Sequence, residues 1–189
     1  MPGAAPVDWL IVGLGNPGAE YDGTRHNVGF EVANVLATRW SLPKAKSKYR
    51  GLLTEGRTGP GGPRVAILRP MTYMNETGDS VGPARGALKV ELDHVLVIHD
   101  EIDLPFGEIR VRTGGGLAGH NGLKSLRARL GSPDFTRIRI GVGRPPTTDP
   151  DRVAAYVLGR FREPKDEVQT VIERAADVAE ETVRNDRAD

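Results

Sequence analysis

The segment DWLIVGLGNPG, residues 8–18, decides the class of fold. It starts with an unbroken apolar run, Trp9 to Val12, which is typical of a strand buried on both faces. It then passes directly into a loop rich in Gly and Asn. A second run of this kind, His94 to Ile98, also leads into polar residues. Strands buried on both faces belong to parallel sheets covered by helices, so the two runs predict an α/β fold.

The rest of the chain alternates between strand and helix patterns. The predicted strands are 48–55, 64–69, 108–113 and 135–142, and the predicted helices are 26–40, 75–88, 121–130 and about 164–184. The Gly- and Pro-rich loop 58–63 has the composition of a hairpin connection. A length of 189 residues without a linker or repeat fits one domain. We therefore predict a single domain over 1–189, with a mostly parallel mixed sheet covered by helices on both faces. A C-terminal amphipathic helix completes it at about 164–184.

The composition excludes several classes of protein. The chain has no Cys, which removes disulfides, thiolate nucleophiles, Cys-based zinc sites and iron–sulfur clusters. The N-terminal residues lack the basic and apolar regions of a signal peptide, and no apolar run approaches the length of a membrane span. We expect a soluble protein of the cytoplasm that makes no contact with a membrane.

The net charge of +1 conceals an uneven distribution. Eight basic residues between Arg39 and Arg69 are accompanied by Glu55 alone, whereas residues 163–189 carry nine acidic and four basic side chains. This asymmetry is typical of a body that meets a polyanion and of an acidic outer helix. Arginines that merely decorate a solvated surface explain the charge equally well, so charge alone leaves both interpretations open.

Residues 13–18 match the dinucleotide-binding pattern G-x-G-x-x-G after a strand. Two features count against a nucleotide-dependent oxidoreductase. Pro17 and the loop 22–24 delay the next helix, so no helix N-terminus opens at the motif. The acidic residue expected about 20 positions further on is also missing, because the first acid after a second strand is Glu55.

Polar residues gather at loops and helix starts, in the segments 15–18, 24–27, 72–75, 99–103 and 119–122. Taken singly, Asn16 is explained by a turn, and Asn75 and Asn121 by helix caps. An imidazole, a carboxylate and three amides from separate loops fit a different chemistry, which is hydrolysis by an activated water. A neutral His takes the proton of the water, the carboxylate orients the imidazole, and amides orient the water and the acyl oxygen.

Two other chemistries are disfavoured. A covalent acyl-enzyme lacks its nucleophile, because the chain has neither a Cys nor a G-x-S-x-G segment. A metal bound by His99, Asp100, Asp103 and His120 would need a spacing that these residues do not have. His99 and Asp100 would also point to opposite faces of a strand. We expect no metal and no cofactor.

Six stretches, in family order, resemble the bacterial-type peptidyl-tRNA hydrolases. They are VGLGNPG (12–18), TRHNVG (24–29), PMTYMN (70–75), HDEIDLPFG (99–107), GHNGLK (119–124) and RIRIGVGRP (137–145). The resemblance implies a monomeric α/β enzyme that needs neither metal nor cofactor. Its substrate would be peptidyl-tRNA, whose ester between the peptide and the 3′-terminal ribose it cleaves, so that tRNA is recycled after premature release.

The resemblance also implies roles for individual residues. His26 is the general base and Asp100 its orienting partner. The substrate-binding residues are Asn16, Tyr21, Tyr73, Met74, Asn75 and Asn121. Contacts to tRNA phosphates are assigned to Arg110, Arg112, Lys124 and Arg139. The arginine guanidinium can bind phosphate through two N–H groups, and the lysine ammonium binds it as a compact charge.

The chain departs from the family pattern in two places. Ala118 replaces a small polar or Gly residue ahead of His120, which predicts a stiffer loop. The acidic tail, which includes Asp186 and Asp189, is a poor phosphate ligand. The sequence therefore leaves open whether the C-terminal helix contacts tRNA or covers the peptide groove with its apolar stripe. A relative that binds RNA without hydrolysis is the alternative, and the presence of His26 and Asp100 favours the enzyme.

Overall fold

A computed structural model describes residues 6–185, and its centre is a seven-stranded sheet in the order β2-β3-β4-β1-β5-β7-β6. The strands are β1 (Trp9–Gly13), β2 (Lys46–Lys48), β3 (Gly51–Arg57), β4 (Arg64–Pro70), β5 (Val95–Glu101), β6 (Ile109–Thr113) and β7 (Thr136–Gly141). The four central strands, β4, β1, β5 and β7, are parallel to one another. The outer pairings are antiparallel. The predicted mixed α/β sheet is confirmed.

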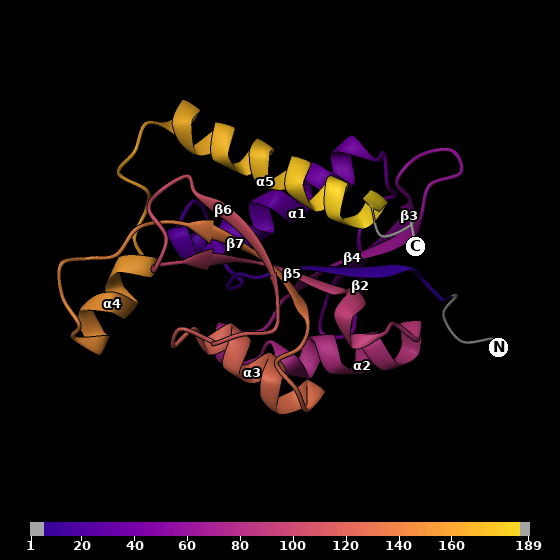
Figure 1. Ribbon diagram of the computed structural model, residues 1–189, viewed down its shortest axis with the longest axis horizontal. Coiled ribbons are helices and arrows are strands. Elements are labelled where there is room, and N and C mark those ends of the chain that lie inside the picture. The colour runs from indigo at the N-terminus through magenta and orange to yellow at the C-terminus, as the bar shows by residue number, and fades with distance from the viewer. Residues whose placement is uncertain (1–5, 186–189) are drawn as a thin grey trace.

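Helices cover both faces of this sheet (Figure 1). They are α1 (Val28–Arg39), α2 (Gly78–Leu88), α3 (Asn121–Leu130), α4 (Pro150–Val157) and α5 (Lys165–Asn185). Helices α1 and α5 pack with Ile11 and Ile98 on one face, and α2 and α3 pack with Leu10 and Val97 on the other. The two apolar runs are therefore buried on both faces, as their composition predicted. The result is a single α/β domain.

The predicted strand 48–55 is wrong at its start, where the chain makes a tight hairpin instead. Lys48 pairs with Gly51, and Tyr49 and Arg50 form the two-residue turn with φ of 53° and 52°. Such turns need left-handed backbone at both positions, a conformation that Asn-Gly signals and that Tyr-Arg does not. Strand β5 is also longer than predicted. It runs through His99 and Asp100 to Glu101, because β7 pairs with it along its whole carboxyl half.

The structure excludes one of the two roles left open for the C-terminal helix. The apolar stripe of α5, which includes Ile172 and Ala175, is buried in the core beside α1. Arg39 of α1 pairs with Glu173 and Asp177 and fastens the two helices together. Asp186 and Asp189, the last acidic residues of the tail, lie outside the described residues. Helix α5 is therefore part of the core and does not cover the peptide groove.

Helix α4 was not predicted from the sequence. It is short and buries none of its side chains fully, so it carries no apolar signal. Its local signal is the pair Asp149-Pro150, since Asp149 caps the helix through the Asp151 N–H and Pro150 occupies the first turn. It lies beyond the carboxyl end of the sheet, apart from the helices of the two faces (Figure 1).

Two glycines bring α1 against the carboxyl ends of β1 and β5. A Cβ on Gly13 would lie 2.4 Å from the carbonyl oxygen of Gly29, and a Cβ on Gly29 would lie 2.3 Å from that of Ile98. The first glycine of the G-x-G-x-x-G pattern thus serves helix packing. The loop that follows forms the short 3₁₀ turn η1 (Ala19–Tyr21), not a helix, as the delayed helix start predicted.

Among residues 6–185, no helix is both long enough and apolar enough to cross a membrane.

Candidate active site

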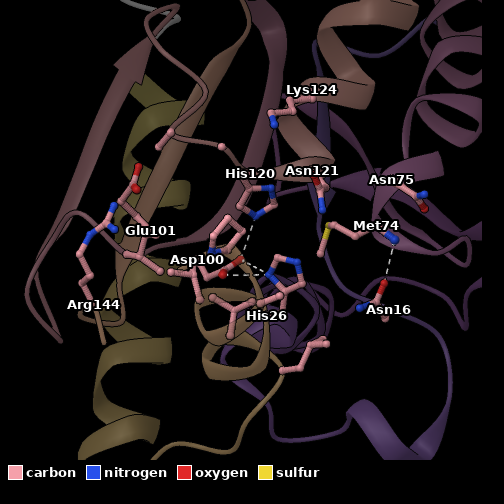
Figure 2. A pocket seen from close by; sticks show the side chains of 18 of the residues that line it. Asn16, His26, Met74, Asn75, Asp100, Glu101, His120, Asn121, Lys124 and Arg144 are labelled. Carbon is pink, nitrogen blue, oxygen red and sulfur yellow. Dashed lines mark hydrogen bonds and ion pairs between the residues drawn. The ribbon is translucent and has the colours of Figure 1, made fainter. Parts of the chain in front are cut away.

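A cavity of about 580 Å³ opens at the carboxyl end of the sheet. One wall is the loop that leads into α3, and the other is α4, whose Val153, Ala154 and Val157 face the cavity. Figure 2 labels the polar and charged side chains that line it, together with Met74. They are Asn16, His26, Asn75, Asp100, Glu101, His120, Asn121, Lys124 and Arg144. The structure therefore brings together every polar segment that the sequence singled out.

His26 is held in one orientation by Asp100. It lies on the 3₁₀ turn η2 (Arg25–Asn27), directly ahead of α1, and its Nδ1 is 2.9 Å from Oδ2 of Asp100. Because the carboxylate only accepts hydrogen bonds, Nδ1 carries the proton and Nε2 keeps a lone pair. Burial by itself would lower the pKa of His26, but the adjacent Asp100 carboxylate raises it above the usual value.

His120 is a second partner of the same carboxylate. Its Nε2 lies 2.9 Å from Oδ1 of Asp100, an oxygen that is also 3.0 Å from Nδ1 of His26 (Figure 2). Its Nδ1 caps α3 by accepting the backbone N–H groups of Gly122 and Leu123 at 3.1 and 3.4 Å. An acceptor at Nδ1 fixes the tautomer, so the Nε2 proton is the one donated to Asp100. The sequence placed His120 in the right segment and missed this role.

The donors around Asp100 keep it ionised. The carboxylate is only 2% exposed, and burial alone would raise its pKa. The imidazoles of His26 and His120 reverse that effect and hold the pKa of Asp100 far below its usual range. Asp100 is therefore a fixed negative charge between two histidines.

His99 lies on the opposite face of β5, as the alternation along the strand predicted. Its Nδ1 donates to the carbonyl oxygen of Asp100 at 2.7 Å, and its ring meets His120 edge-on. Its Nε2 is buried and has no hydrogen-bond partner among the described residues. Burial, reinforced by His120, lowers the pKa of His99 to about 3, so this ring is neutral.

Distance alone would allow a cation at this cluster. One ligand atom each from His26, Asp100 and His120 lie within 4.8 Å of one another. The hydrogen bonds oppose it, because a metal on Nε2 of His120 would displace a proton that cannot move to Nδ1. That nitrogen already accepts the backbone of α3. His99 and Asp103, which the competing metal interpretation included, are not part of the cluster.

Asn16 is held in place through both its side chain and its backbone. Its Oδ1 accepts the Met74 N–H at 2.7 Å. Its backbone N–H and C=O are bound by the side-chain amide of Asn27. With Oδ1 occupied, Nδ2 is the donor that Asn16 offers to a ligand. Asn27 was quoted in the sequence pattern without a role, and it is the residue that fixes this loop.

Asn75 and Asn121 are not helix caps, so the interpretation that explained them singly is wrong. The cap of α3 is His120, and α2 has no side-chain cap. Both Asn side chains are exposed, line the cavity and bond no other described residue. Tyr73 lines its rim and is 56% exposed. Tyr21, on η1, does not line the cavity, so its predicted role stays a prediction.

Four arginines lie on one face of the sheet edge, because β6 and β7 pair Arg110 with Arg139 and Arg112 with Arg137. Arg137 is 2% exposed, and its guanidinium donates to the carbonyl oxygens of Gly116 and Pro133 at 2.6 and 2.8 Å. It therefore holds the glycine loop that leads to His120 and is not available to a ligand.

The other cations differ in how they are paired. Arg110 pairs with Glu108, and Arg139 pairs with Glu101 at 3.1 Å. Arg112 is exposed and has no acidic partner among residues 6–185, and the same holds for Lys124 at the cavity. Of the four predicted phosphate ligands, these two are the ones whose charge is uncompensated.

Comparison with known proteins agrees with this geometry. The sequence profile of the family described as "Peptidyl-tRNA hydrolase" matches residues 10–189. The chain is 49% identical over 172 residues to the peptidyl-tRNA hydrolase of Halalkalibacterium halodurans, covering 90% of this chain and 91% of that one. This chain belongs to the peptidyl-tRNA hydrolase family. The predicted resemblance is thereby confirmed.

Other family members show the same extent of similarity. The peptidyl-tRNA hydrolase of Mycobacterium sp. (strain KMS) is 51% identical over 173 residues, covering 90% of this chain and 88% of the other. The crystal structure of peptidyl-tRNA hydrolase from Acinetobacter baumannii superposes with a TM-score of 0.79 at 41% identity. The superposition covers 90% of this chain and 83% of the Acinetobacter baumannii chain. The family and the fold agree over nearly the whole domain.

Proposed function

We propose that this chain hydrolyses the ester between a peptide and the 3′-terminal ribose of tRNA, with His26 as the general base. The observation that carries the proposal is the orientation of His26. Its Nδ1 is bound to Asp100, which leaves Nε2 as a proton acceptor in a cavity lined by amides. Membership of a family of hydrolases supplies the class of substrate.

The reaction follows from these positions. Nε2 of His26 takes a proton from a water molecule as the water oxygen attacks the acyl carbon. Asp100 stabilises the imidazolium that forms. The tetrahedral intermediate then collapses, the ester bond breaks, and the imidazolium returns its proton to the departing 3′ oxygen of the ribose. The products are a peptide carboxylate and a tRNA with a free 3′-hydroxyl.

The amides stabilise and orient the reacting groups. Because the backbone occupies Oδ1 of Asn16, its Nδ2 is the donor suited to the acyl oxygen, where negative charge develops. Asn75 and Asn121 project both donor and acceptor atoms into the cavity and suit the peptide backbone or the terminal adenosine. Met74 and Tyr73 supply apolar surface beside them.

The tRNA would lie toward the arginine face of β6 and β7. Arg112 and Lys124 have no acidic partner to displace, which favours them as phosphate ligands over Arg110 and Arg139. Such contacts position the RNA without reading its sequence. On this proposal the protein acts as a monomer in the cytoplasm, where its substrate arises, and uses neither a metal nor a cofactor.

The test is release of deacylated tRNA from N-acetylaminoacyl-tRNA by the native protein in excess EDTA. We expect multiple turnovers, with N-acetylamino acid and tRNA as the products. Binding of the tRNA without any release would overturn the proposal and point to an RNA-binding protein. Release that EDTA abolishes and that added metal restores would overturn the metal-free mechanism.

A further inference from the structure

His120 links the N-terminus of α3 to the carboxylate of Asp100 on β5. Its Nδ1 accepts the first backbone N–H groups of α3, and its Nε2 donates to the buried carboxylate of Asp100. A ring with both nitrogens engaged cannot serve as a second base. Its effect on the reaction must therefore pass through Asp100.

The carboxylate shares its charge between two rings. Asp100 accepts from His26 at 2.9 and 3.0 Å and from His120 at 2.9 Å, and the two rings lie 4.9 Å apart. Each N–H donor withdraws negative charge from the carboxylate, which weakens its hold on the other donor. A second donor on Asp100 thus makes the protonated form of His26 less stable.

We propose that His120 is a positioning residue, whose cap on α3 directs its Nε2–H onto Asp100 and so limits how strongly Asp100 holds His26 in its protonated form. The inference rests on the proposed function, and it names the group that limits protonation of the base. The positive end of the α3 dipole lies at Nδ1 of His120 and withdraws electron density from the ring. This makes the Nε2–H group a stronger hydrogen-bond donor to Asp100.

Other ionisable groups face the same cavity and are held constant in the test. They are Tyr73, Glu101, Lys124 and Arg144, and His99 packs edge-on against His120 from the other face of β5. Glu101 is paired with Arg139, and Arg144 with Asp103, so these charges are balanced locally. Lys124, on α3, has no acidic partner among residues 6–185. None of these groups touches Asp100 in the way that His120 does.

Two substitutions of His120 separate its two contacts, the cap on α3 and the hydrogen bond to Asp100. His120→Asn places an amide oxygen near the position of Nδ1, so it keeps the cap and loses the donor to Asp100. His120→Gln places an amide nitrogen near the position of Nε2, so it keeps the donor and weakens the cap. The pair is therefore matched in chemistry and differs in which contact survives.

The experiment follows the protonation of His26 by ¹⁵N NMR in the full chain without substrate, alongside thermal unfolding. We expect the His26 midpoint to rise by about 0.5–1 pH unit in His120→Asn, with little change in the melting temperature. In His120→Gln we expect the midpoint to stay near that of the native protein while the melting temperature falls. The acid limb of kcat/KM should move with the midpoint.

An unchanged His26 midpoint in a folded His120→Asn variant would overturn the proposal and leave His120 as a helix cap only. Equal shifts in both variants would also overturn it, because packing and not the donor would then be responsible. The NMR titration needs no turnover, so a failure of the hydrolase assignment would appear separately, as absence of tRNA release by the native protein.

Discussion

The His26–Asp100–His120 cluster and the arginine face of β6 and β7 both carry charge, yet they are built in opposite ways. In the cluster His26 and Asp100 are buried, and directed hydrogen bonds to Asp100 fix which nitrogen of each imidazole carries the donated proton. On the arginine face Arg112 is exposed, and its neighbour Arg110 is in an ion pair open to water. Changes to the cluster should alter the rate and its pH dependence, whereas changes to the arginine face should alter salt-dependent affinity.

The largest effect that separates the two regions is expected from Asp100→Asn. Without the carboxylate, His26 loses both its orientation and the charge that raises its pKa. We expect kcat/KM to fall by about 10²–10⁴-fold, the typical contribution of general base catalysis. The acid limb of the pH profile, which lies above pH 6.5 in the native protein, should move to lower pH. An acid limb at the same pH as in the native protein would show that Asp100 does not set the pKa of His26.

His99 gives the next largest effect, on stability. Its pKa is about 3 in the folded protein against about 6.5 in the unfolded chain. The unfolded state therefore binds more protons as the pH falls, and stability present above pH 6.5 is lost toward pH 3. At pH 5 the loss is about 2 kcal/mol. Urea unfolding between pH 7 and 5 measures it, and His99→Asn should flatten the slope.

His26 acts in a different pH window and with the opposite sign. Its folded pKa is raised, so the stability it contributes is complete below pH 6.5 and is lost as the pH rises through the folded value. The two histidines can thus be told apart in one titration. A His99→Asn variant that keeps the full acid slope would contradict the assignment of that slope to His99.

A smaller effect is expected when the arginine face is tested by itself. Arg112→Ala should lower the slope of log affinity for tRNA against log salt by about 0.9, the value for one phosphate contact. Arg110→Ala is the matched control on the same strand, and its effect should be less because Glu108 already compensates that charge. Filter binding between 50 and 200 mM salt would check this. Equal changes in both variants would remove the distinction between paired and unpaired arginines.

The smallest effect is expected at the loop that joins the two regions. Ala118 has a φ of 51°, a left-handed conformation that costs an alanine about 1 kcal/mol or more. Ala118→Gly relieves this strain but adds unfolded-state entropy, so we expect a gain of at most ~1 kcal/mol. Chemical denaturation measures it. A clear loss of stability would show that the alanine methyl contributes packing there.

The sequence predicted those features that have a local physical signature. Buried strands such as 94–98 are continuous apolar runs, and the resemblance of the polar segments to the family indicated both His26 and Asp100. Tyr49-Arg50 was missed because its left-handed turn has no typical residues. Helix α4 was missed because it buries nothing fully.

The roles of His120 and Asn27 lay beyond sequence reasoning for a different reason. Each acts through a contact with a segment distant in the chain, such as the 20 positions between His120 and Asp100. The role of α5 was left open for the same reason, since an apolar stripe shows that a helix is covered without showing what covers it. Spacing along the chain does not contain that information.

The most direct test of the account is the single-turnover rate of N-acetylaminoacyl-tRNA cleavage by His26→Ala, measured beside the native protein at saturating enzyme. If His26 is the general base, the rate should be lower by about 10²–10⁴-fold, with tRNA affinity and the melting temperature close to native values. A rate within a few-fold of native would contradict it, because another group would then be activating the water.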